Sequence, residues 1–448
     1  MNNPESLAQV KEKIIEQYDN LPYPHIPIEQ KPTFDYNAFF VHDITTSYYL
    51  AQQKIIERQD KIILDAGCGS GWKTQTIANA NPGAKIVGVD ISPKSIEIAE
   101  ARFKYHGISN CEFHAISLDE ISQLNYQFDY INCDEVIYLL PNPAEGLQML
   151  QSVLSANGIL RTNFHNYYQR FHLLNMQELF ETMGLMEDNP DDFEVEIVKE
   201  TFTNLKNNVG AKGFWQSGFA PFITNADKLK SSVLMNYLLQ SDKGYTIPQV
   251  FTMLADANLQ FLSMTDWRSW NVRDLFQNKE NLPDAWEMGL ENISLEEELH
   301  IYELLNPIHR LIDFWCVNGD ASLPPQESVM AWSFDDWLQA HVTLHPQLRN
   351  DTVKNAFIEA IKSQQSCYLN RFITLTAQGN VEIESNTASC LLSLWEGKQS
   401  FQDLVKRWQQ IKPINLLTLA PVTHEEVCQD MIKTLTKLES FLYVLVEK

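Results

Sequence analysis

The sequence predicts an α/β fold built on a parallel sheet, and two neighbouring segments carry most of the evidence. Residues 61–64 form a short apolar run rich in β-branched side chains, typical of a buried parallel strand, and a glycine-rich turn and a helix-compatible segment follow. Residues 85–90 repeat the pattern and end in an acid, Asp90. Strand and helix alternate to about residue 165. We therefore expect a ligand at the carboxyl ends of the strands, where this fold class binds ligands.

The glycine-rich turn distinguishes between two classes of ligand. A dinucleotide site needs G-x-G-x-x-G, but here Gly67 and Gly69 are followed by Gly71, and Trp72 stands where the third dinucleotide glycine belongs. Asp65, beside the turn, would repel a pyrophosphate. A carboxylate there suits a ligand with an amine and a sulfonium. S-adenosylmethionine has both and carries no phosphate.

Asp90 supports a nucleoside ligand, because a carboxylate at a strand end accepts two hydrogen bonds from a ribose diol. An acid at a strand end also occurs in other Rossmann-like sheets, so Asp90 alone is weak evidence. Asp65, the glycines and Asp90, in this order and one strand–helix unit apart, together favour S-adenosylmethionine over a dinucleotide.

The D-x-G-x-G-x-G turn and the acid after the second strand closely resemble the class I S-adenosylmethionine-dependent methyltransferases. The resemblance, specific over residues 61–165, implies a Rossmann-like core in which the turn meets the methionine end and Asp90 binds the ribose. It also implies that the segment 111–118 wraps the adenine; Ser117 stands where the family often has an acid, so its hydroxyl or the Leu118 backbone would serve. The residues expected to contact the cofactor are Tyr18, Asp65, Gly67, Cys68, Gly69, Asp90, Ile91, Ser117, Leu118 and Cys133.

The end of the fourth predicted strand faces the methyl group in this family, and here it reads Asn-Cys-Asp-Glu over residues 132–135. This is neither Asn-Pro-Pro-Tyr nor Pro-Cys, which mark two classes of DNA-modifying enzyme. Asp134 and Glu135 are candidates to attract and deprotonate an amine, or else to cap a helix. His165, after the fifth strand, is another candidate base or a structural histidine, and Tyr138 is a similar case.

The whole layout also resembles large bacterial methyltransferases with a helical regulatory region and a winged-helix-like carboxyl terminus, some of which methylate lysines of surface proteins. We expect an N-terminal helix and lid strap over residues 1–40 and a methyltransferase domain over 41–276 with a helical insertion at about 167–243. A helical linker region over 277–330 and a mainly helical, winged-helix-like module over 331–448 follow. Tyr18 and Tyr23 are expected to cover the cofactor or to pack against the sheet edge. The insertion is expected to be a substrate lid or an oligomer interface.

Beyond residue 166 the hydrophobic pattern predicts mostly helices. We expect helices over 167–183, 193–208, 247–258, 296–315, 387–395 and 400–410, a strand over 260–265, and a hairpin that pairs 372–375 with 381–383. Ser400 is a predicted helix cap. A last helix over 424–446 carries an apolar stripe, Met431, Leu435, Leu438 and Leu442, that is expected to be core or the seam of a homodimer.

Composition limits the possible partners. The formal net charge of −24 argues against nucleic acid and against anionic membranes. No apolar run approaches membrane-span length and the N-terminus lacks a signal core, so we expect a cytoplasmic protein. The seven cysteines have no zinc spacing, and no metal is expected. The sequence thus predicts methyl transfer to an amine or hydroxyl of a small molecule, peptide or protein; alternatives are a non-catalytic S-adenosylmethionine-binding scaffold or regulatory protein, or another use of the cofactor.

Overall fold

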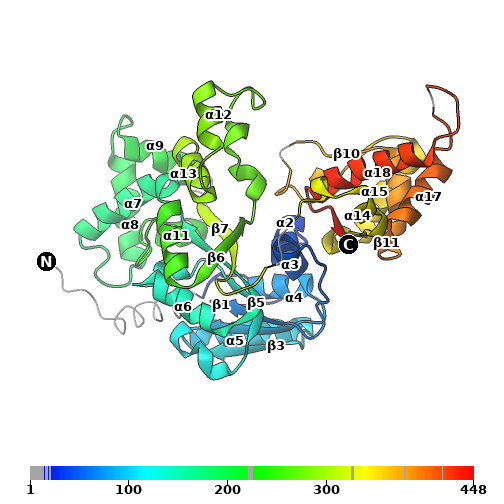
Figure 1. Ribbon diagram of the computed structural model, residues 1–448. Coiled ribbons are helices and arrows are strands. Elements are labelled where there is room, and N and C mark those ends of the chain that lie inside the picture. The colour runs from blue at the N-terminus through cyan, green and yellow to red at the C-terminus, as the bar shows by residue number, and fades with distance from the viewer. Residues whose placement is uncertain are drawn as a thin grey trace.

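The computed structural model describes residues 15, 19, 22–219, 226–323, 327–377, 379–415 and 417–448, without the side chains of 219, 226 and 227. Figure 1 shows a large sheet domain beside a smaller C-terminal module, with α2 (Tyr36–His42) and α3 (Ile44–Gln52) between them. Tyr18 and the helical pattern expected before it lie outside the described residues.

A seven-stranded sheet in the order β3-β2-β1-β4-β5-β7-β6 forms the core of the large domain. Its strands are β1 (Ile62–Ala66), β2 (Lys85–Asp90), β3 (Cys111–Ala115), β4 (Phe128–Cys133), β5 (Leu154–His165), β6 (Leu259–Met264) and β7 (Leu311–Asn318). The first five run parallel, and β7 lies antiparallel between β5 and β6. The predicted α/β class and the Rossmann-like core are therefore confirmed.

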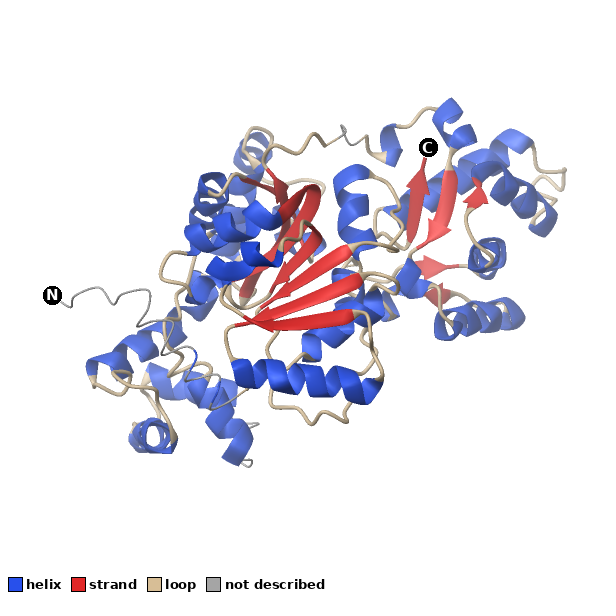
Figure 2. Cartoon of the chain, turned by 90° about the horizontal axis from the view of Figure 1, so that it is seen from below, coloured by secondary structure: helices blue, strands red, loops and turns tan. Residues whose placement is uncertain are grey.

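Both faces of the sheet are buried, because successive strand residues point to opposite sides. Ile63 and Ile86 join a core with α2, α3, α4 (Trp72–Ala80) and α5 (Pro93–His106), whereas Leu64 and Val87 join a core with α6 (Pro143–Val153) and α11 (Ile247–Asp256). Figure 2 shows helices on both sides of the strands. Strands covered on both faces read as nearly continuous apolar runs, which is why β1 and β2 were visible in the sequence.

The insertion after β5 is helical, as predicted. It comprises α7 (Tyr167–Thr182), α8 (Asp192–Asn204), α9 (Gly210–Phe219) and α10 (Ala226–Leu234). Phe180, Val198, Phe202 and Tyr237 belong to a core of the insertion's own, separate from the two cores of the sheet. The insertion is thus a packed helical body carried by the carboxyl end of β5 (Figure 1).

The helix predicted over residues 296–315 is confirmed in its first half and wrong in its second. After α12 (Asp284–Leu290), α13 (Leu295–Leu305) ends before Pro307, and the chain then forms β7. Proline disfavours the helical conformation of the residue before it. Ile312 and Phe314 point to one face of the sheet and Trp315 to the other, so β7 is a central strand within the segment expected to be a helical linker region.

The C-terminal module combines helices with two small sheets, and two predictions within it need correction. Cys367–Tyr368 (β9), and not residues 372–375, pairs with Glu382–Ile383 (β10). The last helix ends at Glu439, where the chain turns into β12 (Val444–Glu447) against β8 (His341–Leu344), which also pairs with β11 (Gln399–Ser400). The module's helices are α14 (Phe334–Gln339), α15 (Asp351–Ser363), α16 (Ser385–Leu391), α17 (Phe401–Ile411) and α18 (His424–Glu439). The predicted cap is confirmed, since the Ser400 hydroxyl accepts from the Asp403 backbone N–H. Its winged-helix-like character stays a prediction.

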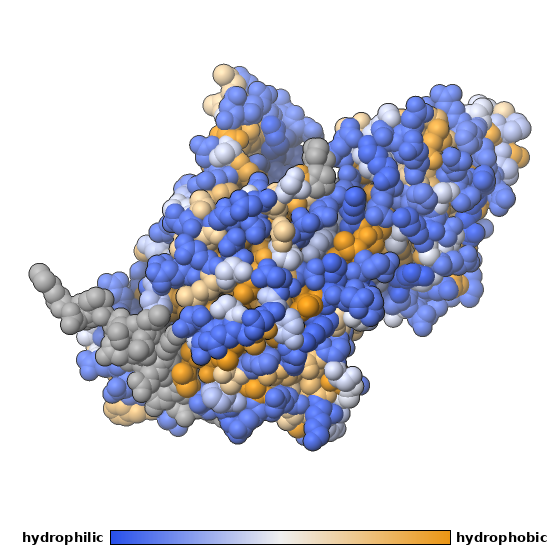
Figure 3. Space-filling model, turned by 60° about the horizontal axis from the view of Figure 1, so that its bottom comes forward, coloured by the Kyte–Doolittle hydropathy of each residue, from blue (hydrophilic) through white to orange (hydrophobic). Residues whose placement is uncertain are grey.

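Short 3₁₀ helices complete the chain: η1 (Leu118–Leu124), η2 (Ile137–Leu139), η3 (Trp267–Trp270), η4 (Val272–Leu275), η5 (Val329–Ala331), η6 (Pro346–Leu348), η7 (Leu369–Arg371) and η8 (Leu392–Trp395). The view in Figure 3 is mostly hydrophilic, with apolar residues in small groups. Among the described segments, no helix has both the length and the apolar character to cross a bilayer.

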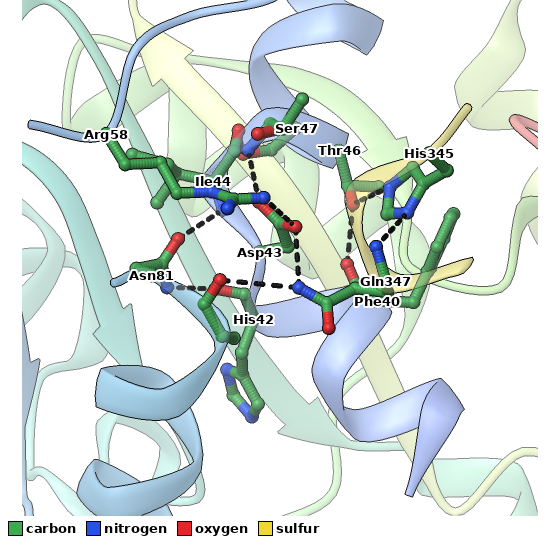
Figure 4. Close-up of polar contacts among 12 residues, drawn as sticks. Phe40, His42, Asp43, Ile44, Thr46, Ser47, Arg58, Asn81, His345 and Gln347 are labelled. Atoms are coloured by element: carbon green, nitrogen blue, oxygen red, sulfur yellow. Dashed lines mark hydrogen bonds and ion pairs between the residues drawn. The ribbon is translucent and has the colours of Figure 1, made fainter. Parts of the chain in front are cut away.

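A buried polar network joins the large sheet domain to the C-terminal module (Figure 4). The Asp43 carboxylate caps α3, pairs with Arg58 through two hydrogen bonds of 3.1 and 2.5 Å, and accepts from Gln347 Nε2 at 2.7 Å. His345 accepts from the Gln347 backbone N–H on Nδ1, so its Nε2–H donates to Thr46 Oγ1 at 3.0 Å. Both ring nitrogens of the neutral imidazole are thereby used.

This network predicts acid sensitivity at the junction. Burial lowers the pKa of His345 to about 4, so between pH 6.5 and 4 the unfolded chain binds a proton that the folded chain refuses. The free energy of unfolding therefore decreases as the pH is lowered through this window, by up to about 3 kcal/mol for this group. His345→Asn, which keeps an acceptor for the Gln347 N–H, is expected to lose stability at pH 7 but to show a smaller further loss at pH 4. Urea unfolding at both pH values measures this, and equal losses in both proteins would contradict it.

Candidate functional site

A cavity of about 580 Å³ opens at the carboxyl ends of β1, β2, β4 and β5. Predicted site residues that line it are Asp65, Gly67, Cys68, Gly69, Asp90, Ile91, Ser117, Leu118, Asp134, Glu135 and His165. Cys133 is fully buried at the end of β4 and is not one of the residues on the wall. Segments far apart in the sequence thus meet at one place, because parallel strands bring their carboxyl ends to the same edge.

The glycine turn needs glycine at two positions that touch the cavity. Gly67 has φ +79°, and a Cβ there would lie 2.2 Å from Val136 Cγ2. Gly69 has φ +50°, and a Cβ there would lie 2.3 Å from the Tyr23 carbonyl oxygen. The turn therefore leaves room for close approach to its backbone, and a larger residue at either position would be strained.

The segment that contains Tyr23 lies against this turn. The Ser70 backbone N–H donates to Tyr23 O at 3.1 Å, and the Ser70 hydroxyl donates to Pro24 O at 2.8 Å. The Arg102 guanidinium holds the next carbonyls, those of Ile26 and Pro27, at 2.7 and 3.0 Å. Tyr23 itself lines the cavity, so the strap reaches the site.

Two buried carboxylates organise the strand ends. Asp90 accepts the Gly69 N–H at 2.8 Å on one oxygen and the Ser92 N–H at 2.9 Å on the other. Asp65 accepts from Thr74 Oγ1 at 2.6 Å and from Asn132 Nδ2 at 2.7 Å. Burial raises the pKa of both acids. Since each carboxylate oxygen accepts two hydrogen bonds, Asp90 keeps acceptor capacity toward the cavity.

Ser117 is already engaged in local structure. It caps η1 in a capping box with Glu120, and its hydroxyl contacts both Asp119 and Glu120. Asp119 also lines the cavity, two positions after the place where an acid was sought. The sequence pattern therefore missed an acid that the first turn of η1 brings to the wall.

The two acids after β4 are held by cations. Asp134 forms an ion pair with Lys73, lies 3.4 Å from Arg161, and accepts from Asn163 Nδ2. Glu135 forms an ion pair with Arg310. Burial raises the pKa of Glu135, but Arg310 and Lys73 outweigh burial and hold that pKa below its ordinary value. Both acids are therefore paired with cations.

His165, at the end of β5, contacts both an acid and a cation. Its Nδ1 lies 2.6 Å from Asp242 Oδ1, and Arg310 Nη1 lies 3.2 Å from its Nε2. Burial lowers the pKa of His165, and Arg170 and Arg310 act in the same direction against Asp242. A neutral imidazole therefore faces the cavity at pH 7.

Three residues at the site were not predicted from the sequence, Lys73, Asp242 and Arg310, and only Lys73 has a local signal. Lys73 directly follows the glycine turn and Trp72. Asp242 and Arg310 lie 77 and 145 positions from His165 and meet it only through the fold.

Comparisons with known proteins point to a methyltransferase domain. A family model described as "Methyltransferase domain" matches residues 57–236. An uncharacterized protein of Synechococcus is 27% identical over 338 residues, which is 75% of this chain and 76% of that protein. A ubiquinone biosynthesis O-methyltransferase of Colwellia psychrerythraea is 25% identical over 215 residues, or 47% of this chain and 86% of that protein. The solved structure of PKMT2 from Rickettsia typhi in complex with AdoHcy shares the fold, with a TM-score of 0.58 at 16% identity over 95% of this chain and 77% of that one.

The contact between turn and strap predicts a specific effect of Gly69→Ala. The new Cβ would push the Tyr23 carbonyl away, so the hydrogen-exchange protection of the Ser70 amide is expected to fall at least about tenfold. Gly107→Ala is the matched control, since Gly107 has φ +67° and a Cβ there would meet nothing within 4 Å. Equal protection of Ser70 in the two variants would show that the strap does not bind the turn.

Proposed function

We propose that this chain, a class I S-adenosylmethionine-dependent methyltransferase, transfers the methyl group to an amine or a hydroxyl. His165 removes the proton of that amine or hydroxyl. The acceptor belongs to a small molecule, a peptide or a protein. The observation that carries the proposal is a neutral imidazole on the cavity wall, oriented by a carboxylate on its other nitrogen.

The residues of the cavity fit S-adenosylmethionine. Asp90 has free acceptor capacity for the ribose hydroxyls, and the turn from Gly67 to Gly69 lets the methionine end approach the backbone. Ile91 and Leu118 offer apolar surface for the adenine. Asp119 is a better-placed acceptor for the adenine amino group than Ser117, whose hydroxyl is engaged in the cap.

The acceptor's proton needs an uncharged base whose lone pair can be reached from the cavity, and His165 suits this better than the two acids. The Nε2 lone pair accepts from Arg310 at 3.2 Å, and the nucleophile's proton replaces that contact. When bound, S-adenosylmethionine supplies a methyl group on a positively charged sulfur. His165 Nε2 takes the proton that the nucleophile loses, and Asp242 stabilises the imidazolium that results. Asp134 and Glu135 hold Lys73 and Arg310 in place, so we assign them a supporting role.

Cofactor and acceptor together would displace water from the cavity and fix the line of attack, which favours methyl transfer over side reactions with water. Tyr23 borders this cavity, as do Met235 and Leu239, which follow α10 in the helical insertion. We propose that these residues form part of the entrance for the methyl acceptor. A cytoplasmic location and a homodimer remain predictions from the sequence.

Ligand binding tests the cofactor assignment. We expect calorimetry to detect S-adenosylhomocysteine and to find no binding of NAD. Asp90→Asn is expected to raise the dissociation constant of S-adenosylhomocysteine by about 10- to 100-fold. This corresponds to roughly 1.5–3 kcal/mol, the contribution of a charge-assisted hydrogen bond. The exposed Asp256→Asn is the control. An unchanged dissociation constant in Asp90→Asn would mean that another residue binds the ribose.

Methyl transfer itself tests the base. Cell extract incubated with isotope-labelled S-adenosylmethionine and the protein should yield labelled products by mass spectrometry. With His165→Gln, we expect their rate of formation to fall by about 10²- to 10⁴-fold, while the affinity for S-adenosylhomocysteine stays within about twofold. The wild-type rate should fall below the lowered pKa of His165, so its acid limb lies below pH 6.5. Labelling by His165→Gln at the wild-type rate would exclude His165 as the base.

A further inference from the structure

The contact between His165 and Asp242 is buried on both sides. The side chains are 2% and 0% exposed, and Nδ1 lies 2.6 Å from Oδ1. We propose that Asp242 is the positioning residue that keeps the proton of His165 on Nδ1, so that the lone pair of Nε2 faces the cavity. The proposal rests on the proposed function, since it explains how His165 serves as a base.

Two independent contacts require this tautomer. An ionised carboxylate only accepts hydrogen bonds, so His165 Nδ1 must carry the proton that it shares with Asp242. A guanidinium only donates, so Nε2, at 3.2 Å from Arg310 Nη1, must present its lone pair. The two ends of the ring therefore agree, and the Tyr138 ring, with its centroid 4.1 Å away, packs against the imidazole.

The helical insertion fixes Asp242 in turn. Its second oxygen accepts from Arg170 Nη2 at 2.8 Å and from Gln177 Nε2 at 2.9 Å, and both residues belong to α7. Burial raises the pKa of Asp242, but His165 and Arg170 outweigh burial and lower it to about 2. The insertion thus holds an ionised carboxylate behind the base, in addition to any contact with substrate.

These donors make Asp242→Asn an informative variant. The oxygen of the new amide must face the two donors on α7, because its NH₂ group cannot accept from them. The NH₂ group is then left facing His165 Nδ1, which must become the acceptor. The proton then moves to Nε2, because the amide is held by the donors on α7, whereas the Arg310 side chain is 48% exposed and can turn away from a ring that now presents a donor to the cavity. The variant keeps the shape of the site and reverses the tautomer.

Nitrogen-15 spectra of the full-length protein, with labelled histidine, measure this directly. The groups that face the ring are Asp242, Arg170, Arg310, Glu135 and Tyr138, and all contribute to its titration. The spectra are therefore recorded at pH 7.5, where the ring is neutral. His165→Gln assigns the signals. In the wild type we expect a protonated Nδ1 and an unprotonated Nε2, and in Asp242→Asn the two nitrogens exchange these states.

Two controls separate Asp242 from its neighbours. Arg310→Met removes the donor at Nε2 and is expected to keep the wild-type tautomer, because Asp242 still accepts from Nδ1. Asp188→Asn makes the same chemical change at an exposed position of the insertion and is expected to change nothing.

The proposal is overturned if the wild type carries its proton on Nε2, if Asp242→Asn keeps it on Nδ1, or if Arg310→Met alone reverses the tautomer. Should Asp242→Asn fail to fold, the wild type and Arg310→Met still decide. None of these spectra requires a methyl acceptor. If the tautomer is as expected but His165→Gln transfers methyl groups normally, the proposed base fails and the role of Asp242 in fixing the ring stands.

Discussion

The buried guanidinium of Arg161 holds together the edge of the sheet on which the cavity is built. From β5, it donates to Asn132 Oδ1 on β4 at 2.7 Å and to Asp313 Oδ2 on β7 at 2.6 Å. Asn132 passes the connection to Asp65 on β1. Four strands are thereby tied by charge-assisted contacts away from water, where loss of one partner leaves a buried charge and costs about 3–5 kcal/mol. The positions of the residues that line the cavity depend on this arrangement.

Electrostatics at the cavity differ from those of the chain as a whole. The net charge of −24 and the adjacent acids suggested a negative mouth, but Lys73 and Arg310 neutralise Asp134 and Glu135 there. A formal charge is spread over the surface, whereas a site is shaped by the few groups within contact distance. Because these two acids are paired, we propose the uncharged His165 as the base.

The sequence predicted what local patterns encode and missed what only the fold brings together. The glycine turn and Asp90 each lie at the end of a short apolar strand, and His165 ends the fifth strand of the alternating pattern, so their places at the carboxyl ends of the strands could be inferred from their order. The strand β7 was mistaken for helix because its apolar residues continue a helical pattern and one of its two partners, β5, lies about 150 positions earlier. Asp242 and Arg310 stand in segments without a recognisable motif, and only the contact with His165 gives them a role. Tyr18 lies outside the described residues, so its role stays a prediction.

The proposed function requires that the cavity hold S-adenosylmethionine with its methyl group directed at His165. A crystal structure of the complex with S-adenosylhomocysteine would show this. We expect ribose hydroxyls on Asp90, the amino acid end on the glycine turn, and the sulfur facing the wall formed by Glu135 and His165. A nucleoside bound elsewhere, or a sulfur directed away from His165, would rule out the proposed function.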